Sequence, residues 1–87
     1  MSIREAQPGD VADILRLIKD LAEYEKAPEE VVATEAHLTR ALFNSNPHVF
    51  AHVVEVDNRI VGIAIWFLNY STWQGTHGIY LEDLYIE

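Results

Sequence analysis

Two adjacent acids, Glu82 and Asp83, interrupt the apolar sequence of residues 80–87. Removing a carboxylate from water disfavours its charged form unless a partner compensates, so the pKa of such a group rises. A carboxyl group of this kind can accept a proton near neutral pH or hold a cation. Neighbouring side chains of a strand point to opposite faces, so we expect the two acids not to form one dyad unless a bulge intervenes. Ion pairs with Arg4 or Arg59 are the structural alternative.

A third acid, Glu25, lies at the end of the most regular helical pattern in the sequence. Apolar residues recur at three- and four-residue steps over positions 11–22, which predicts an amphipathic helix, and Glu25 continues the same apolar line. A negative charge at this end of a helix is unfavourable because it meets the negative pole of the helix dipole. A bound amine would relieve the charge, and so would Lys26 or Arg40.

The elements that would position these acids follow one another without a linker or an internal repeat. In order, the sequence predicts a strand at 2–6, a helix from Pro8, a loop at 26–32, a helix from Thr34 to near residue 44, a strand at 49–56, a turn at 57–58, a strand at 59–70 that is covered on both faces over 60–68, a loop at 71–78 and a strand at 79–87. We therefore expect one domain over residues 1–87, of mixed α/β (α+β) class, with the order β-α-α-β-β-β and a mostly antiparallel sheet.

The composition restricts the class of partner. The 87 residues are 49% hydrophobic, which is typical of a folded domain, and carry a formal net charge of −8. A nucleic-acid binder needs a basic surface, so we expect no nucleic-acid partner. The longest uncharged apolar stretch, residues 60–70, is too short to cross a membrane, and no targeting segment is visible.

The side chains that bind metals and form disulfides give a similar restriction. The chain has no cysteine, which excludes a disulfide and is compatible with a cytoplasmic location. Its four histidines lack the spacing of a metal site, so we expect no metal.

Four sequence features occur together and point to a known family. They are Pro8-Gly-Asp after the first strand, Leu21-Ala-Glu-Tyr-Glu25 at the end of the helix, Val61-Gly-Ile-Ala in the hairpin, and Tyr80-Leu-Glu-Asp-Leu-Tyr-Ile. The combination resembles the GNAT superfamily of acyl-CoA-dependent N-acetyltransferases. Within it, the chain is most similar to the spermidine/spermine (diamine) N-acetyltransferase family, including its thialysine-acetylating relatives. The likeness extends over essentially all of the chain, but only to the N-terminal half of a family domain.

The resemblance implies transfer of an acetyl group from acetyl-CoA to a primary amine of a small polyamine, diamine or lysine-like substrate. Direct attack of the amine on the thioester is expected. Glu82 matches the family's group that assists deprotonation of the amine, and we take it as the catalytic residue. Tyr24 and Glu25 match a pair that contacts the amine substrate. Glu82 itself, Asp83 and Trp73 are further candidates for binding the amine.

The resemblance also assigns a role to the backbone of Leu84, Tyr85 and Ile86. In the family, these positions pair with the pantetheine arm of acetyl-CoA, as an exposed strand edge pairs with an extended partner. The family's glycine-rich pyrophosphate loop, fifth strand and tyrosine proton donor have no counterpart up to Glu87. We therefore expect the missing C-terminal half to come from a separate chain or from the same, longer polypeptide, and we expect this chain alone to be inactive. A homodimer is also expected, from the family and from the uncovered edge.

Two alternatives to this interpretation stay open. The first is a non-catalytic split or truncated GNAT module that binds a partner through its open edge. The second keeps the fold and the activity but changes the acceptor to a peptide N-terminus or an aminoglycoside.

Overall fold

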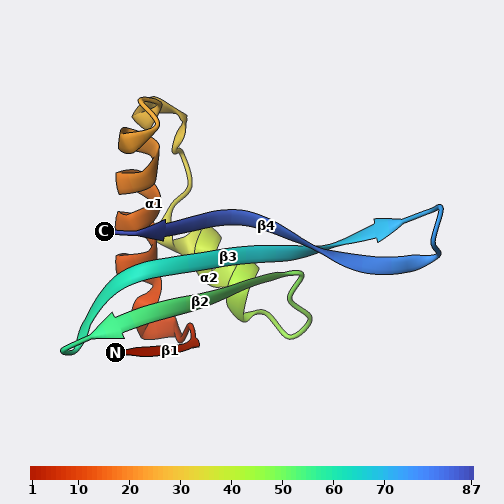
Figure 1. Ribbon diagram of the computed structural model, residues 1–87, viewed down its shortest axis with the longest axis horizontal. Coiled ribbons are helices and arrows are strands. Elements are labelled where there is room, and N and C mark those ends of the chain that lie inside the picture. The colour runs from red at the N-terminus through yellow and green to blue at the C-terminus, as the bar shows by residue number, and fades with distance from the viewer.

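The computed structural model describes the side chains of residues 1–69 and 72–87 and places two helices on one face of a sheet (Figure 1). The elements in order are β1 (Ser2–Glu5), the 3₁₀ turn η1 (Pro8–Asp10), α1 (Val11–Tyr24), the 3₁₀ turn η2 (Pro28–Glu30), α2 (Glu35–Phe43), β2 (Val49–Val56), β3 (Arg59–Ser71) and β4 (Thr76–Ile86). The predicted order β-α-α-β-β-β is confirmed, and the mixed class with it.

The four strands form one sheet in the order β1-β2-β3-β4, and every pairing is antiparallel. The core lies between the sheet and the helices, where the largest fully buried side chains are Ile14, Leu17, Val53 and Ile63. Figure 1 shows that α1 crosses the sheet and that its C-terminal half projects beyond the outer edge of β4. The C-terminal half of α1 and the segment that follows it therefore lie beside the outer edge of β4.

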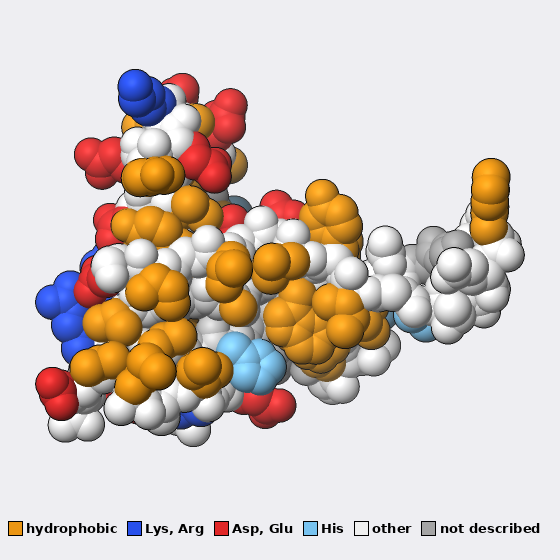
Figure 2. Space-filling model, viewed as in Figure 1, with side chains coloured by type: hydrophobic (Ala, Val, Ile, Leu, Met, Phe, Trp, Pro, Cys, Tyr) orange, Lys and Arg blue, Asp and Glu red, His pale blue; other side chains and the backbone are white. Residues whose placement is uncertain are grey.

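The opposite face of the sheet corrects one expectation. Residues 60–68 are not covered on both faces, because the helices lie on one face only and Trp66 is half-buried on the other. On β4 the side chains of Leu84 and Ile86 are 62% and 57% exposed. Hydrophobic side chains accordingly gather over the sheet in Figure 2. The apolar run in the sequence therefore indicates a surface that could be buried, and not one that is buried within this chain.

The hairpin between β3 and β4 is also longer than expected. Residues 71–78 were predicted to form a loop, but the strands continue until the connection at residues 72–75. Backbone pairing such as that of Asn69 with Gly78 needs no apolar side chain, so the two strands extend beyond the core as a twisted arm (Figure 1). Polar and glycine-rich composition was therefore misleading here.

Local signals in the sequence correctly placed the tight turn and the second helix. Asp57 and Asn58 both have positive φ, 50° and 65°, as a two-residue hairpin turn between right-twisted strands requires. Thr34 caps α2: its Oγ1 accepts a hydrogen bond from the N–H of His37 at 3.2 Å, and its own N–H donates to Nδ1 of His37 at 3.1 Å. These reciprocal bonds satisfy two backbone donors at the start of the helix.

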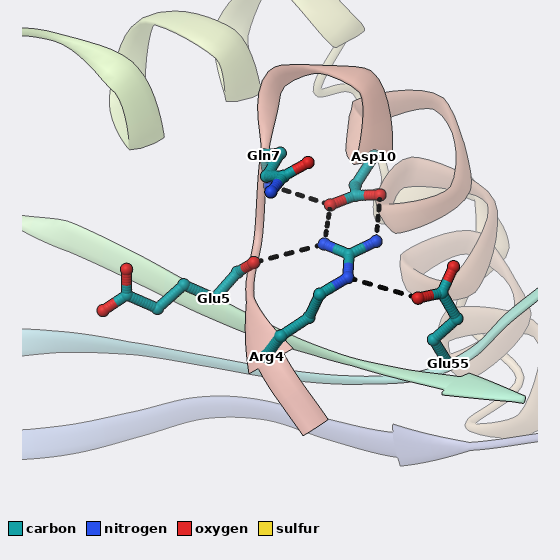
Figure 3. Close-up of polar contacts among 5 residues, drawn as sticks. All are labelled: Arg4, Glu5, Gln7, Asp10 and Glu55. Atoms are coloured by element: carbon teal, nitrogen blue, oxygen red, sulfur yellow. Dashed lines mark hydrogen bonds and ion pairs between the residues drawn. The ribbon is translucent and has the colours of Figure 1, made fainter. Parts of the chain in front are cut away.

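A network of polar contacts joins the first strand to the start of α1 (Figure 3). Asp10 is 7% exposed, and its carboxylate accepts hydrogen bonds from Arg4 at 2.7 and 3.1 Å and from the N–H of Gln7 at 2.8 Å. Arg4 also donates to Glu55 at 3.3 Å. The hydrogen bonds from Arg4, above all, lower the pKa of Asp10 below its ordinary value. The guanidinium of Arg4 is thus paired with Asp10 and Glu55.

We predict that Asp10→Asn lowers the free energy of unfolding at pH 7 by about 1–2 kcal/mol, because the mutant loses charge-assisted hydrogen bonds that are partly screened by solvent. The contribution of Asp10 is present above its unfolded-state pKa and disappears as the pH falls through its lower folded-state pKa. Urea unfolding at several pH values should therefore show the two proteins converging in acid. Asp13→Asn, which removes a half-buried acid outside this network, is the control. A pH-independent difference for Asp10→Asn would contradict this account.

The end of α1 depends on one residue with a left-handed backbone conformation. Lys26 has φ 62°, and the N–H of Lys26 and of Ala27 bond to the carbonyls of Glu23 at 3.0 Å and Ala22 at 2.8 Å. This pair of bonds is the Schellman arrangement, in which glycine usually occupies the left-handed position. Lys26 therefore stores backbone strain where the chain turns out of the helix.

We predict that Lys26→Gly raises the free energy of unfolding by about 1 kcal/mol, because glycine adopts this φ without strain. Lys19→Gly is the matched control in the interior of α1 and should lower stability by about 1 kcal/mol. Urea denaturation of the three proteins measures both effects. Equal destabilisation by the two substitutions would contradict the assignment of strain to Lys26.

Candidate functional site: an acidic pocket beside the outer edge of β4

A pocket of about 380 Å³ lies between the C-terminal half of α1, residues 27–33 and β4. Apolar side chains form much of its wall, among them Ile18, Leu21 and Val31. Four acids line it as well: Glu25, Glu30, Glu82 and Asp83. The pocket therefore combines apolar surface with converging negative charge, which suits a cation on an alkyl chain.

A bulge in β4 brings Glu82 and Asp83 to the same pocket. Asp83 pairs with Ile65 and Leu81 pairs with Trp66, so Glu82 is the extra residue between two regular pairs. A bulge re-aims side chains and breaks the strict alternation of faces. The two acids were expected on opposite faces unless a bulge intervened; the bulge is present, and both acids line one cavity.

The pKa of Asp83 is raised above its ordinary value, first by burial and then by the neighbouring charges of Glu82 and Glu25. The sequence predicted such a shift for an acid among apolar groups, and Asp83 is half-buried at that place. Among the described residues, the acids of the pocket make no ion pair; Arg4 and Arg59, the alternative partners, bind other acids. The negative charge in the pocket is therefore not neutralised within the described part of this chain.

Glu25 reaches the pocket because it caps α1. Its N–H donates to the carbonyl of Leu21 at 3.0 Å, and the chain then turns through Lys26 into η2. The structure thus brings together three of the predicted substrate-binding residues, Glu25, Glu82 and Asp83, from two elements that are distant in sequence.

Two other predicted residues lie outside the pocket lining. Tyr24, the last residue of α1, is 79% exposed. Trp73 is 97% exposed and lies at the connection between β3 and β4, on the arm that extends away from the body (Figure 1). Their roles stay predictions that depend on the family resemblance.

Glu30 is a pocket residue that the sequence analysis missed. Its position depends on how the 3₁₀ turn after α1 folds back toward β4. Pro28 signalled a turn, but no local pattern indicated which of the following side chains would face the pocket.

The backbone of residues 84–86 adjoins the pocket along β4. In the described sheet β4 pairs only with β3, so one edge of Leu84, Tyr85 and Ile86 is not engaged by another strand. Such an edge offers alternating N–H and C=O groups to an extended partner. The role of these residues in binding acetyl-CoA stays a prediction from the family resemblance.

A second pocket, of about 410 Å³, lies between the end of β1, the C-terminal end of α2 and residues 50–52 of β2. Its wall is mainly apolar and aromatic and includes Phe50 and Trp66, whose rings stack at 4.4 Å. Glu5 and His52 are the titratable residues that line it. It is similar in size to the acidic pocket, but it lacks converging charges and is the weaker candidate for amine chemistry.

The described residues contain no group of three or more His, Cys, Asp or Glu side chains that could hold a metal ion. No helix in this part of the chain is long and apolar enough to cross a membrane.

Comparison with known proteins gives close relatives in sequence. A thialysine N-epsilon-acetyltransferase of Bos taurus is 40% identical over 93 residues, covering 98% of this chain and 54% of that protein. The spermidine/spermine N(1)-acetyltransferase-like protein 1 of Homo sapiens is 37% identical over 91 residues, covering 97% of this chain and 13% of that protein. The chain thus spans about half the length of the thialysine acetyltransferase. No protein-family profile matches it.

Solved structures show the same fold at lower identity. A probable acetyltransferase matches 100% of this chain and 57% of its own length, with a TM-score of 0.76 and 17% identity. An aminoglycoside acetyltransferase from an uncultured soil metagenomic sample, in complex with sisomicin, has a TM-score of 0.73 at 19% identity, covering 99% of this chain and 55% of its own. Together, these findings confirm that the chain resembles the GNAT superfamily of N-acetyltransferases, with thialysine and spermidine/spermine acetyltransferases as its relatives, and that its fold is half of a GNAT domain.

Proposed function

We propose that the complete protein, meaning this chain with the remaining half of a GNAT domain, is an acetyl-CoA-dependent N-acetyltransferase. Its acceptor is a primary amine of a small polyamine, diamine or lysine-like substrate. The observation that carries the proposal is the convergence of Glu25, Glu82 and Asp83, without an ion pair in the described chain, in a pocket beside an open strand edge. The sequence relatives, whose names specify thialysine and spermidine/spermine acetylation, support the same acceptor class.

The pocket binds the amine in its protonated, cationic form, and a group in the pocket then removes the proton. At pH 7 an alkyl amine is mostly protonated, and only the neutral amine can attack a thioester. Glu25 and Asp83 attract the cation, while Glu82 accepts the proton, directly or through a water. Tyr24 and Trp73 belong to the amine site in this proposal, from the family resemblance alone.

Acetyl-CoA supplies the activated acetyl group as a co-substrate when it is bound. The backbone of Leu84, Tyr85 and Ile86 orients the pantetheine arm through hydrogen bonds at the outer edge of β4. The neutral nitrogen forms a bond to the carbonyl carbon as the carbon–sulfur bond breaks, and CoA leaves as the thiolate. The nitrogen then loses its extra proton to give the amide, and a proton passes to the CoA sulfur. No metal takes part in this proposal.

The remaining half of the domain is the first partner in this proposal. The match to only 54% of the Bos taurus relative supports such a half, and so does the apolar sheet face in Figure 2. A homodimer and a cytoplasmic location belong to the same proposal.

The exposed sheet face also supports a second candidate function. A split or truncated GNAT module without catalysis would use this face and the edge of β4 to bind a partner protein. The face includes the exposed side chains of Ile3, Leu84 and Ile86. An inactive complete protein that still forms a stable complex would favour this candidate.

We predict that residues 1–87 alone transfer no measurable acetyl group and that the complete protein acetylates a diamine or thialysine. Glu82→Gln should lower kcat/KM by about 10²–10⁴-fold, the usual contribution of a positioned general base. The matched control is Glu29→Gln, which removes an exposed acid that does not line the pocket. The assay compares a diamine, thialysine, an aminoglycoside and a peptide N-terminus as acceptors. Activity of the 87-residue chain, or full activity of Glu82→Gln, would refute the proposal.

The raised pKa of Asp83 gives a prediction for stability. Since the folded state holds the proton more tightly than the unfolded state, stability is greatest below the ordinary pKa of 3.8 and declines as the pH rises toward the folded-state value. Asp83→Asn should therefore raise the free energy of unfolding at pH 7 and flatten this decline. Thermal unfolding from pH 3 to 7 tests both statements, with Glu29→Gln as the control. A destabilised Asp83→Asn with an unchanged pH profile would be the contrary result.

A further inference from the structure

The last residue of the structure binds two arginines from different elements. Oε1 of Glu87 lies 2.7 Å from Nη2 of Arg59, and Oε2 lies 3.0 Å from Nη1 of Arg16. Arg16 also donates from Nη2 to the carbonyl of Ile60 at 2.8 Å. The side chain of Glu87 is 25% exposed, so these pairs are partly shielded from solvent.

The contacts connect β4 to α1 and to the start of β3. Arg16 lies in α1 and Arg59 is the first residue of β3. The N–H of Glu87 donates to the carbonyl of Val61 at 2.9 Å, so backbone and side chain hold the same point. Figure 1 shows why this point matters, since the C-terminal end lies where β4 passes over α1.

The segment that Glu87 restrains is the open edge described above. Residues 84–86 lie between the bulge at Glu82 and the ion pairs of Glu87, and they have a strand on one side only. The end of an edge strand frays unless it is tied down. At Gly62 a Cβ would lie 2.5 Å from Cδ1 of Ile86 and 3.2 Å from the carbonyl oxygen of Tyr85, so β4 approaches β3 closely at this place.

We propose that Glu87 is a positioning residue that holds residues 84–86 in the register needed to bind the acyl-CoA co-substrate. The inference depends on the proposed function for its consequence in catalysis, but not for its consequence in structure. Glu87 touches neither substrate and acts through the backbone of β4. Removing its charge leaves the acidic pocket intact and loosens the neighbouring edge.

The other acids near Arg16 provide a matched control. Asp13 lies 3.5 Å and Asp20 lies 3.7 Å from the guanidinium of Arg16, but both belong to α1. Asp20→Asn therefore removes an ion pair of Arg16 without releasing β4. Glu87→Gln removes both ion pairs at the end of β4. Arg59→Gln replaces an exposed side chain and removes one of the two.

The test measures hydrogen exchange and kinetics of the complete protein. Glu87→Gln should speed amide exchange over residues 84–86 about five-fold, as expected for the loss of two partly exposed ion pairs. It should raise KM for acetyl-CoA by about the same factor and leave KM for the diamine unchanged. Arg59→Gln should shift the same two quantities in the same direction by less, and Asp20→Asn should change neither.

Two results would overturn the inference. One is unchanged exchange over residues 84–86 in Glu87→Gln, and the other is an equal rise in both Michaelis constants. If the unsubstituted protein shows no acetyl transfer, the proposed function fails, and hydrogen exchange in the absence of ligand still decides whether Glu87 positions the edge.

Discussion

Negative charge converges where α1 ends beside β4, and the described chain supplies no cation to neutralise it. Burial raises the pKa of Asp83, and the neighbouring charges of Glu82 and Glu25 raise it further. Such an arrangement lowers stability unless a proton or a bound cation compensates. A small domain has little stability in reserve, so this cost indicates a function for the pocket rather than a role in folding.

The backbone features that create this convergence are unfavourable by local rules. Lys26 takes a left-handed conformation that favours glycine, and Glu82 is an extra residue in an otherwise regular ladder. Together they point acids from a helix end and from a strand into one pocket. Departures of this kind concentrate at functional sites, because the surrounding structure must support them. The nearby edge of residues 84–86 then places hydrogen-bonding backbone next to that pocket.

The sequence predicted the features that depend on local periodicity. The strand and helix order, the turn at Asp57 and the start of the second helix at Thr34 all follow from neighbouring residues and were confirmed. Non-local features were missed. The bulge at Glu82 depends on how β4 meets β3, and the pocket position of Glu30 depends on how η2 folds back. The open face of the sheet could not be predicted, since an apolar strand looks the same whether or not its cover belongs to this chain.

The most direct test is the pKa of Asp83, measured by carboxyl NMR of the complete protein with and without a saturating diamine. A cation in the pocket stabilises the charged carboxylate, so the account predicts that the pKa of Asp83 falls when the diamine binds. Glu25→Gln and Glu82→Gln should each weaken that response. A diamine that binds and leaves the pKa of Asp83 unchanged would show that the amine is held elsewhere, and would contradict the central claim.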